Sequence, residues 1–128
     1  MSAATPAPRV LLVDDNQGSR HELRLLLEDC GIEVVAEGEN GQEAVELVSR
    51  TDADVVLMDL RMPVMDGLEA ARALRDRAPA LPVIILSAYE DPALKSEAAA
   101  VNAYAYLVKG CSGGLVLDTI EQAFQATR

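Results

Sequence analysis

The feature that most constrains the fold is an alternation of short apolar runs with longer amphipathic runs, repeated five times. The short runs have the length and apolar character of buried strands, and they cover residues 10–13, 33–37, 55–58, 82–86 and 103–108. The longer runs carry apolar side chains at helical spacing, and they cover residues 19–29, 40–50, 67–77, 92–100 and 115–126. The sequence therefore predicts five strand–helix units.

Strands that are apolar on both faces and separated by helices predict a parallel sheet, because parallel neighbours need crossover connections and the helices then cover both faces. The expected fold class is α/β, a doubly wound five-stranded parallel sheet. No G-x-G-x-x-G segment follows the first strand, and the glycine clusters do not match a P-loop. The pattern thus favours the flavodoxin-like strand order 2-1-3-4-5 over a dinucleotide-binding fold.

Composition excludes several classes of function. The 11 Lys and Arg residues against 21 Asp and Glu residues give a formal net charge of −10, whereas binding to nucleic acid or anionic lipid requires a positive surface. Aromatic residues are only 3% and Trp is absent, so a base-stacking platform is not expected. Two distant cysteines and a single His cannot form a zinc site or a redox pair. We expect a soluble, cytoplasmic protein with reduced thiols that contacts neither nucleic acid nor a membrane.

The chain has the length of a single domain. Residues 1–8 consist of small residues and proline after the initial Met, with no apolar stretch. We expect them to form a disordered N-terminal lead rather than a signal peptide. Residues 9–128 are then the one folded domain.

Three carboxylates follow two strands that flank the reversal of strand order. Asp14 and Asp15 end the first strand and Asp59 ends the third, and ligands of open parallel sheets bind at this point. A cluster of oxygen ligands suits Mg²⁺. Taken alone, an Asp pair after a strand is more often a helix N-cap or a solvated turn than a metal site, and Asp59 alone could be a turn residue. Their joint occurrence favours a metal site.

Two further polar side chains follow the fourth and fifth strands at the same edge. Taken singly, Ser87 reads as a turn hydroxyl and Lys109 as a solvated charge. Next to the acids, they would instead form a clamp for a tetrahedral anion. A carboxylate that becomes a mixed anhydride needs no general base, which makes Asp59 a candidate for an aspartyl phosphate.

These residues belong to a series of segments with a recognisable order and spacing. The segments are Asp14-Asp15, Met58-Asp-Leu-Arg-Met-Pro63, Asp66-Gly67, Ser87-Ala88 and Ala105-Tyr-Leu-Val-Lys109. With this series, the chain resembles the receiver domain of two-component response regulators from Arg9 to about Ala126.

The resemblance implies a function and a ligand set. Asp59 would accept a phosphoryl group from a histidine kinase, and the domain would catalyse only its own phosphorylation and dephosphorylation rather than act as an enzyme on other substrates. Asp15 and Asp59 would bind Mg²⁺ directly together with the backbone carbonyl of Arg61, while Asp14 would act mainly through a bound water. Lys109 would hold phosphoryl oxygens.

The resemblance also implies a switch. Ser87 would hold a phosphoryl oxygen, and Tyr106 would be the aromatic residue that responds and alters the face made by the fourth helix, the fifth strand and the fifth helix. We expect a homodimer through this face on phosphorylation. Arg61 and Tyr89 would flank the path of the water that hydrolyses the phosphoryl group. The domain would thus be a phosphorylation-controlled signalling switch in a phosphorelay that regulates transcription.

Two residues depart from the family pattern. Gly110 stands where most receivers have a proline with a cis bond, so we expect a trans or more mobile loop after Lys109. Asn102 stands where a glycine is usual, and asparagine is the best substitute in a left-handed turn. The run Lys109-Gly-x-Ser112 and the Ala-rich fourth helix resemble receivers joined to a helix-turn-helix domain. A receiver acting alone and a receiver with a DNA-binding output domain outside this chain both stay open.

Two other functions rank lower. A Mg²⁺-dependent phosphohydrolase of the aspartyl-phosphate type would need a second acid two residues after the nucleophile, where Arg61 stands, and would need a cap insertion. An unphosphorylated docking module would have lost site residues, and this chain has all of them.

Overall fold

The computed structural model describes residues 7–127. Its strands are β1 (Arg9–Val13), β2 (Glu33–Gly38), β3 (Val55–Asp59), β4 (Val83–Ser87) and β5 (Ala105–Val108). Its helices are α1 (Gln17–Asp29), α2 (Gly41–Val48), α3 (Gly67–Arg77), α4 (Pro92–Ala100) and α5 (Gly113–Ala126). Most of the expected N-terminal lead, residues 1–6, lies outside the described residues. Pro8, which was assigned to that lead, is buried, and its carbonyl accepts a hydrogen bond from the Glu33 amide.

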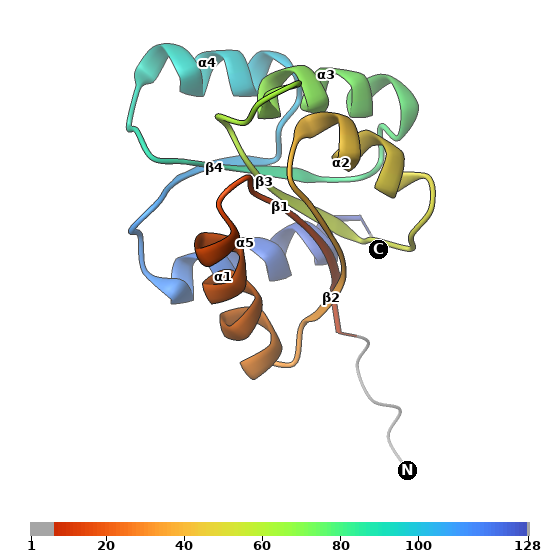
Figure 1. Ribbon diagram of the computed structural model, residues 1–128, viewed down its shortest axis with the longest axis vertical. Coiled ribbons are helices and arrows are strands. Elements are labelled where there is room, and N and C mark those ends of the chain that lie inside the picture. The colour runs from red at the N-terminus through yellow and green to blue at the C-terminus, as the bar shows by residue number, and fades with distance from the viewer. Residues whose placement is uncertain (1–6, 128) are drawn as a thin grey trace.

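The five strands form one parallel sheet in the order β2-β1-β3-β4-β5 (Figure 1). This confirms the predicted α/β class and strand order. Strands β1, β3 and β4 lie inside the sheet, and every residue of β3 and β4 is buried. Their apolar runs are continuous because both faces of these strands are covered.

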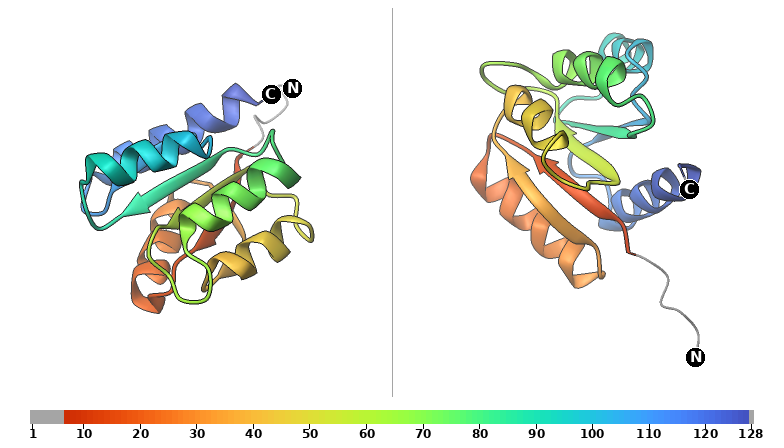
Figure 2. Two further views of the ribbon diagram at one scale, coloured as in Figure 1. Left: turned by 90° about the horizontal axis from the view of Figure 1, so that it is seen from above. Right: turned by 90° about the vertical axis from the view of Figure 1, so that its right-hand side faces the viewer.

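Helices cover the sheet on both sides: α2, α3 and α4 lie on one face, and α1 and α5 lie on the other (Figures 1 and 2). Each face has its own core. Leu74 of α3 packs in the first core, together with Leu11 and Val13 of β1. Ile120 and Phe124 of α5 pack in the second. Alternate residues of a strand point to opposite faces, so β1, β3 and β4 contribute to both cores.

Helix starts differ from the sequence-based expectation where a polar cap extends the helix. The predictions began at residues 19 and 115, whereas α1 begins at Gln17 and α5 at Gly113. The side chain of Asn16 accepts a hydrogen bond from the Ser19 amide, and the Ser112 hydroxyl accepts one from the Leu115 amide. Such N-caps satisfy otherwise unpaired amides, so the first turn forms before the apolar periodicity starts.

The last strand is shorter than predicted, because it begins at Ala105 rather than at residue 103. Asn102 adopts a left-handed conformation with φ of 62°, as predicted for the residue that replaces glycine in this turn. Because of this turn, β5 begins two residues later than predicted. The Tyr104 amide, just before the strand, donates to the Val83 carbonyl at 2.7 Å.

Two further expectations can be compared with the described residues. Within this part of the chain, no helix is both long enough and apolar enough to cross a membrane. Cys30 and Cys111 are both free thiols.

Candidate functional site

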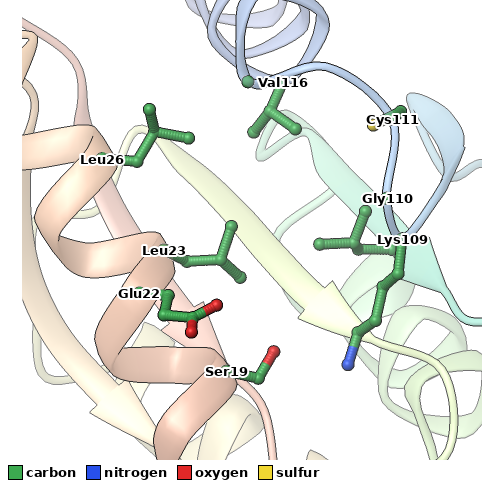
Figure 3. Close-up of a pocket in the computed structure, with 10 residues that line it drawn as sticks. Ser19, Glu22, Leu23, Leu26, Lys109, Gly110, Cys111 and Val116 are labelled. Carbon is green, nitrogen blue, oxygen red and sulfur yellow. The ribbon is translucent and has the colours of Figure 1, made fainter.

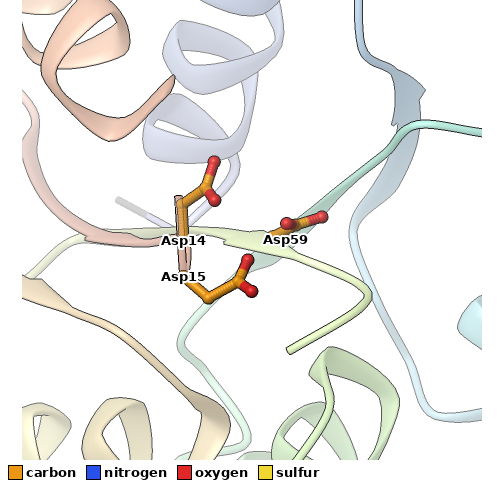
Figure 4. A group of neighbouring side chains, drawn as sticks. All are labelled: Asp14, Asp15 and Asp59. Carbon is orange, nitrogen blue, oxygen red and sulfur yellow. The ribbon is translucent and has the colours of Figure 1, made fainter. Parts of the chain in front are cut away.

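The three aspartates meet at one edge of the sheet. Asp14 and Asp15 follow β1, Asp59 ends β3, and each contributes a carboxylate oxygen within 4.8 Å of the others (Figure 4). Asp14 and Asp59 are buried, whereas Asp15 is exposed. Three negative charges at this separation repel one another unless a cation offsets them.

Asp14 is held in place through both its backbone and its side chain. Its amide donates to the Gly38 carbonyl at 3.0 Å, and one carboxylate oxygen accepts from the Asn16 amide at 2.9 Å. The other carboxylate oxygen accepts from Nζ of Lys109 at 3.2 Å. The N-cap of α1 is Asn16, so neither aspartate of the pair caps that helix.

Asp59 is fixed by the chain that follows it. One of its carboxylate oxygens accepts from the Leu60 amide at 2.8 Å, and the other accepts from Nζ of Lys109 at 3.2 Å. The start of α3 presses against this strand end, since the Gly67 amide donates to the Leu60 carbonyl at 2.7 Å. A Cβ atom on Gly67 would overlap the backbone carbonyl oxygen of Asp59. Only glycine allows this approach without a backbone shift.

Lys109 reaches the acids from the loop after β5. Its Nζ atom contacts Asp14 and Asp59 at the same distance, and its side chain is 27% exposed. Figure 3 shows the Lys109 side chain among residues that line a pocket between α1 and the loop after β5. No peptide bond among residues 7–127 is cis, so the Lys109–Gly110 bond is trans, one of the two outcomes expected. Gly110 has a φ of 91°. This conformation is available to glycine, and Lys109 still points at the acids.

Burial and neighbouring charges shift the pKa values of both Asp59 and Lys109. Burial raises the pKa of Asp59, the Lys109 ammonium lowers it and the Asp14 carboxylate raises it, so that the pKa of Asp59 lies above its ordinary value. Burial lowers the pKa of Lys109, but Asp59 and Asp14 raise it further, so that the net shift is upward. Lys109 is therefore charged at neutral pH, and its single charge does not offset the acids.

Ser87 and Tyr106 are connected through the backbone of Tyr89. Ser87 ends β4, is fully buried, and its hydroxyl accepts from the Tyr89 amide at 3.1 Å. The hydroxyl of Tyr106 donates to the Tyr89 carbonyl at 2.6 Å. A movement of the loop after β4 would therefore act on Tyr106 directly.

Arg61 lies beside the acid pair. It lines a surface hollow together with Asp15 and Asp66. Its guanidinium carbon is 5.9 Å from the centroid of the Tyr89 ring, a distance typical of a cation–π contact. Three methionines of β3 and the loop after it pack in or against the first core: Met58, Met62 and Met65.

One residue of the site was not predicted from the sequence. Arg20 lies on α1, is buried, and donates from Nη1 to the Asp14 carbonyl at 2.5 Å. In the sequence it is one of several charged residues of an amphipathic helix, and neither its type nor its position distinguishes it from a solvated charge. Gly67 was recognised only as part of a family segment, without its contact to Asp59.

Comparison with known proteins agrees with this geometry. Residues 10–121 match the family described as "Response regulator receiver domain". The chain belongs to this family. It is therefore a receiver domain, a signalling module of two-component phosphorelays.

Relatives of this receiver include proteins of two kinds. The transcriptional regulatory protein DegU of Brevibacillus brevis is 35% identical over 91% of this chain and 50% of its own length. The chemotaxis protein CheY of Listeria monocytogenes is 36% identical over 90% of this chain and 97% of its own length. The chain thus spans about half the length of the first and nearly all of the second.

Solved structures agree with the receiver fold. The signal receiver domain of NarL from Mycobacterium tuberculosis superposes with a TM-score of 0.90 at 30% identity, covering 94% of this chain and 98% of that one. A two-component response regulator of the LuxR family from Aurantimonas also gives a TM-score of 0.90, at 31% identity, covering 96% of this chain and 89% of that one.

Proposed function

We propose that this receiver accepts a phosphoryl group on Asp59 from a histidine kinase in a Mg²⁺-dependent reaction. The observation that carries the proposal is the arrangement of three carboxylates within 4.8 Å of one another around a single ammonium group. A structural ion pair would match one acid with one base. Here the excess of negative charge calls for a divalent cation. Among the three acids, Asp59 at the end of β3 is the one that the resemblance to receivers implies as the acceptor.

The donor set fits Mg²⁺, which prefers oxygen ligands and keeps several waters. Asp15 and Asp59 would bind the ion directly together with the backbone carbonyl of Arg61, and Asp14 would act mainly through a water. Asp15 is exposed and so can exchange its waters for an incoming ion. The bound ion would offset the repulsion of the acids and withdraw charge from the phosphoryl oxygens.

The reaction needs no general base. In its deprotonated form, the Asp59 carboxylate forms a bond from one oxygen to phosphorus while the bond from phosphorus to the histidine nitrogen breaks. Lys109 lies 3.2 Å from Asp59 and would hold an oxygen of the transferred group. The Ser87 hydroxyl accepts from Tyr89, so its own proton can be donated to another phosphoryl oxygen.

The same contacts suggest how the output face responds. When Ser87 turns toward the phosphoryl group, it leaves the Tyr89 amide, and the loop carrying the Tyr89 carbonyl moves away from Tyr106. Tyr106 then turns inward. The new hydrogen bond of Ser87 to the charged phosphoryl group can change the free-energy difference between the two states by about 1.5–3 kcal/mol. This corresponds to about a 10- to 150-fold shift in their populations.

The face that changes consists of α4, β5 and α5. It exposes Lys95, Ser96, Ala99 and Tyr104. We expect phosphorylation to favour a homodimer through this face. The relatives that are transcriptional regulatory proteins are longer than this chain, and a DNA-binding output domain outside residues 9–128 would be the target of the switch.

The test uses labelled acetyl phosphate as donor with the wild-type chain and with Asp15→Ala. We expect labelling that requires Mg²⁺, is lost in excess EDTA and is slower in Asp15→Ala at limiting Mg²⁺, because one direct ligand is removed. Labelling that proceeds equally in EDTA would contradict the proposed role of the acid cluster.

A further inference from the structure

Arg20 is a charged residue that the fold buries beneath the acid pair. Its side chain is only 10% exposed, although it lies on a helix at the surface of the molecule. A charge is rarely buried unless it is paired and hydrogen-bonded, because desolvation costs more than a single contact returns. The groups that Arg20 contacts therefore indicate which part of the structure it stabilises.

The guanidinium group joins α1 to two other segments. Nε donates to Glu37 at the end of β2 at 2.8 Å, and Nη1 donates to the backbone carbonyl of Asp14 at 2.5 Å. Nη2 lies 3.9 Å from a carboxylate oxygen of Glu39. Because the guanidinium is planar and rigid, its attachment to Glu37 fixes the direction in which it meets Asp14.

The Asp14 carbonyl belongs to the peptide that joins Asp14 to Asp15. A peptide unit is planar, so a strong donor on its oxygen fixes the orientation of the whole unit. The Asp14 amide is already bound to the Gly38 carbonyl. Arg20 thus fixes the second side of Asp14, and it fixes the orientation of the peptide unit to which Asp15 is attached. Asp15 is exposed, so packing alone does not determine where its carboxylate lies.

Arg24 provides an internal comparison. It lies one turn further along α1 and also pairs with Glu37, as well as with Glu28. Its contacts tie the helix to the sheet, but they do not include the acid pair. A purely structural role for Arg20 would resemble that of Arg24.

We propose that Arg20 is a positioning residue that holds the Asp14–Asp15 peptide so that the Asp15 carboxylate faces Asp59, and that it thereby sets the affinity of the site for Mg²⁺. The inference rests on the proposed function, since it concerns the same metal site. It adds a residue outside the acid cluster whose loss should weaken binding.

The direction in which the Mg²⁺ affinity changes when Arg20 is replaced distinguishes a positioning role from a purely electrostatic one. Removal of a positive charge near three acids should by itself tighten the binding of a cation. Loss of a positioning contact should weaken it, and the loss of such an outer partner typically costs about tenfold or more in metal affinity. The experiment is a calorimetric titration of Mg²⁺ alone into the wild type, Arg20→Met and the matched control Arg24→Met.

We expect about a tenfold weaker affinity for Arg20→Met and no weakening for Arg24→Met. An Arg20→Met affinity equal to or tighter than that of the wild type overturns the inference. If the wild type itself binds no Mg²⁺, the proposed function fails instead. Urea unfolding in EDTA establishes that each variant is folded before the titration.

Arg20→Lys decides the matter if Arg20→Met does not fold. Lysine keeps the charge but offers a compact ammonium in place of the planar fork, so it cannot meet Glu37 and the Asp14 carbonyl in the same way. We expect its Mg²⁺ affinity to remain reduced. Wild-type affinity in Arg20→Lys would show that charge alone suffices and would overturn the inference.

A double-mutant cycle tests whether Arg20 acts through Asp15. In an Asp15→Ala background, Arg20→Met should cause no further loss of Mg²⁺ affinity, because the ligand that Arg20 orients is already absent. Losses that add fully would show that Arg20 acts by another route.

Discussion

The guanidinium group of Arg61 lies over the ring of Tyr89, with its carbon 5.9 Å from the ring centroid. Arg61 follows the proposed acceptor by two residues in the loop after β3, and Tyr89 follows Ser87 by two in the loop after β4. Two exposed side chains from different loops therefore meet beside the site. The resemblance to receivers implies that both would flank the path of the hydrolytic water, so we expect their contact to slow hydrolysis of the phosphoryl group.

We predict that Arg61→Ala and Tyr89→Ala each lose the phosphoryl group faster than the wild type. An exposed cation–π contact stabilises by about 0.5–1 kcal/mol, so a water that must wait for the pair to open should enter about two- to fivefold more often without it. The decay of labelled protein after removal of the donor measures this rate. Arg72→Ala, an exposed arginine of α3, is the control. Unchanged or slower decay in both test variants would count against a covering role.

A second prediction concerns Ser87. Ser87→Ala removes the hydroxyl that we expect to leave the Tyr89 amide for the phosphoryl group. Mg²⁺ binding and labelling should be largely retained, whereas the shift toward dimer on phosphorylation should be lost. Sedimentation of the phosphorylated protein measures the shift. If the variant associates as strongly as the wild type, the hydroxyl is not the transmitter of the signal.

A third prediction concerns Gly67. In Gly67→Ala, the new methyl group would overlap the Asp59 carbonyl, so the backbone must move. We expect a loss of about 1–3 kcal/mol in the free energy of unfolding, as for other overpacked sites, and slower labelling because the acceptor is displaced. Urea titration and labelling rates provide the measurements.

Gly114→Ala is the matched control for this variant. Gly114 lies in α5, and a Cβ there would meet only the Ser112 hydroxyl at 3.9 Å. Alanine is a better helix former, so this variant should be as stable as the wild type or more stable. If the two substitutions change the free energy of unfolding and the labelling rate equally, the contact of Gly67 with Asp59 is not the cause of the change.

A fourth prediction concerns pH. Burial by itself raises the pKa of Glu37, but its ion pairs with Arg24 and Arg20 lower it more, so that the net shift is downward. The unfolded chain then binds this proton more readily, and the stabilisation by Glu37 is present above its ordinary pKa and is lost as pH falls through the lowered value.

The measurement is the free energy of unfolding of the wild type and of Glu37→Gln across acidic pH. The wild type should have the larger free energy of unfolding at neutral pH, and its difference from Glu37→Gln should shrink from about pH 5 downward. A difference between the two proteins that does not change with pH would show that the charge of Glu37 does not contribute.

The sequence predicts the fold well because its periodicity reflects burial. Apolar runs such as residues 55–58 are buried on both faces, and together with the helices between the strands they indicate a parallel sheet. The convergence of Asp14, Asp15 and Asp59 follows from the same topology, because the carboxyl ends of adjacent parallel strands meet at one edge.

Contacts that depend on tertiary geometry could not be predicted in this way. Arg20 reaches the Asp14 carbonyl only because α1 packs against the sheet with that turn facing inward. The hydrogen bond from Tyr106 to the Tyr89 carbonyl joins β5 to the loop after β4, and no local sequence signal indicates that these two segments lie close together. The starts of α1 and α5 were predicted too late because the caps Asn16 and Ser112 act before the apolar pattern begins.

The central claim is that Asp59 is the phosphoryl acceptor, and the most direct test is the intact mass of the protein after treatment with acetyl phosphate and Mg²⁺. The wild type should gain the mass of one phosphoryl group, and Asp59→Asn should gain none. Asp66→Asn is the control, because asparagine can replace aspartate as the N-cap of α3 and the site remains complete. It should be modified like the wild type. A phosphoryl group on Asp59→Asn in the same yield as on the wild type would contradict the account.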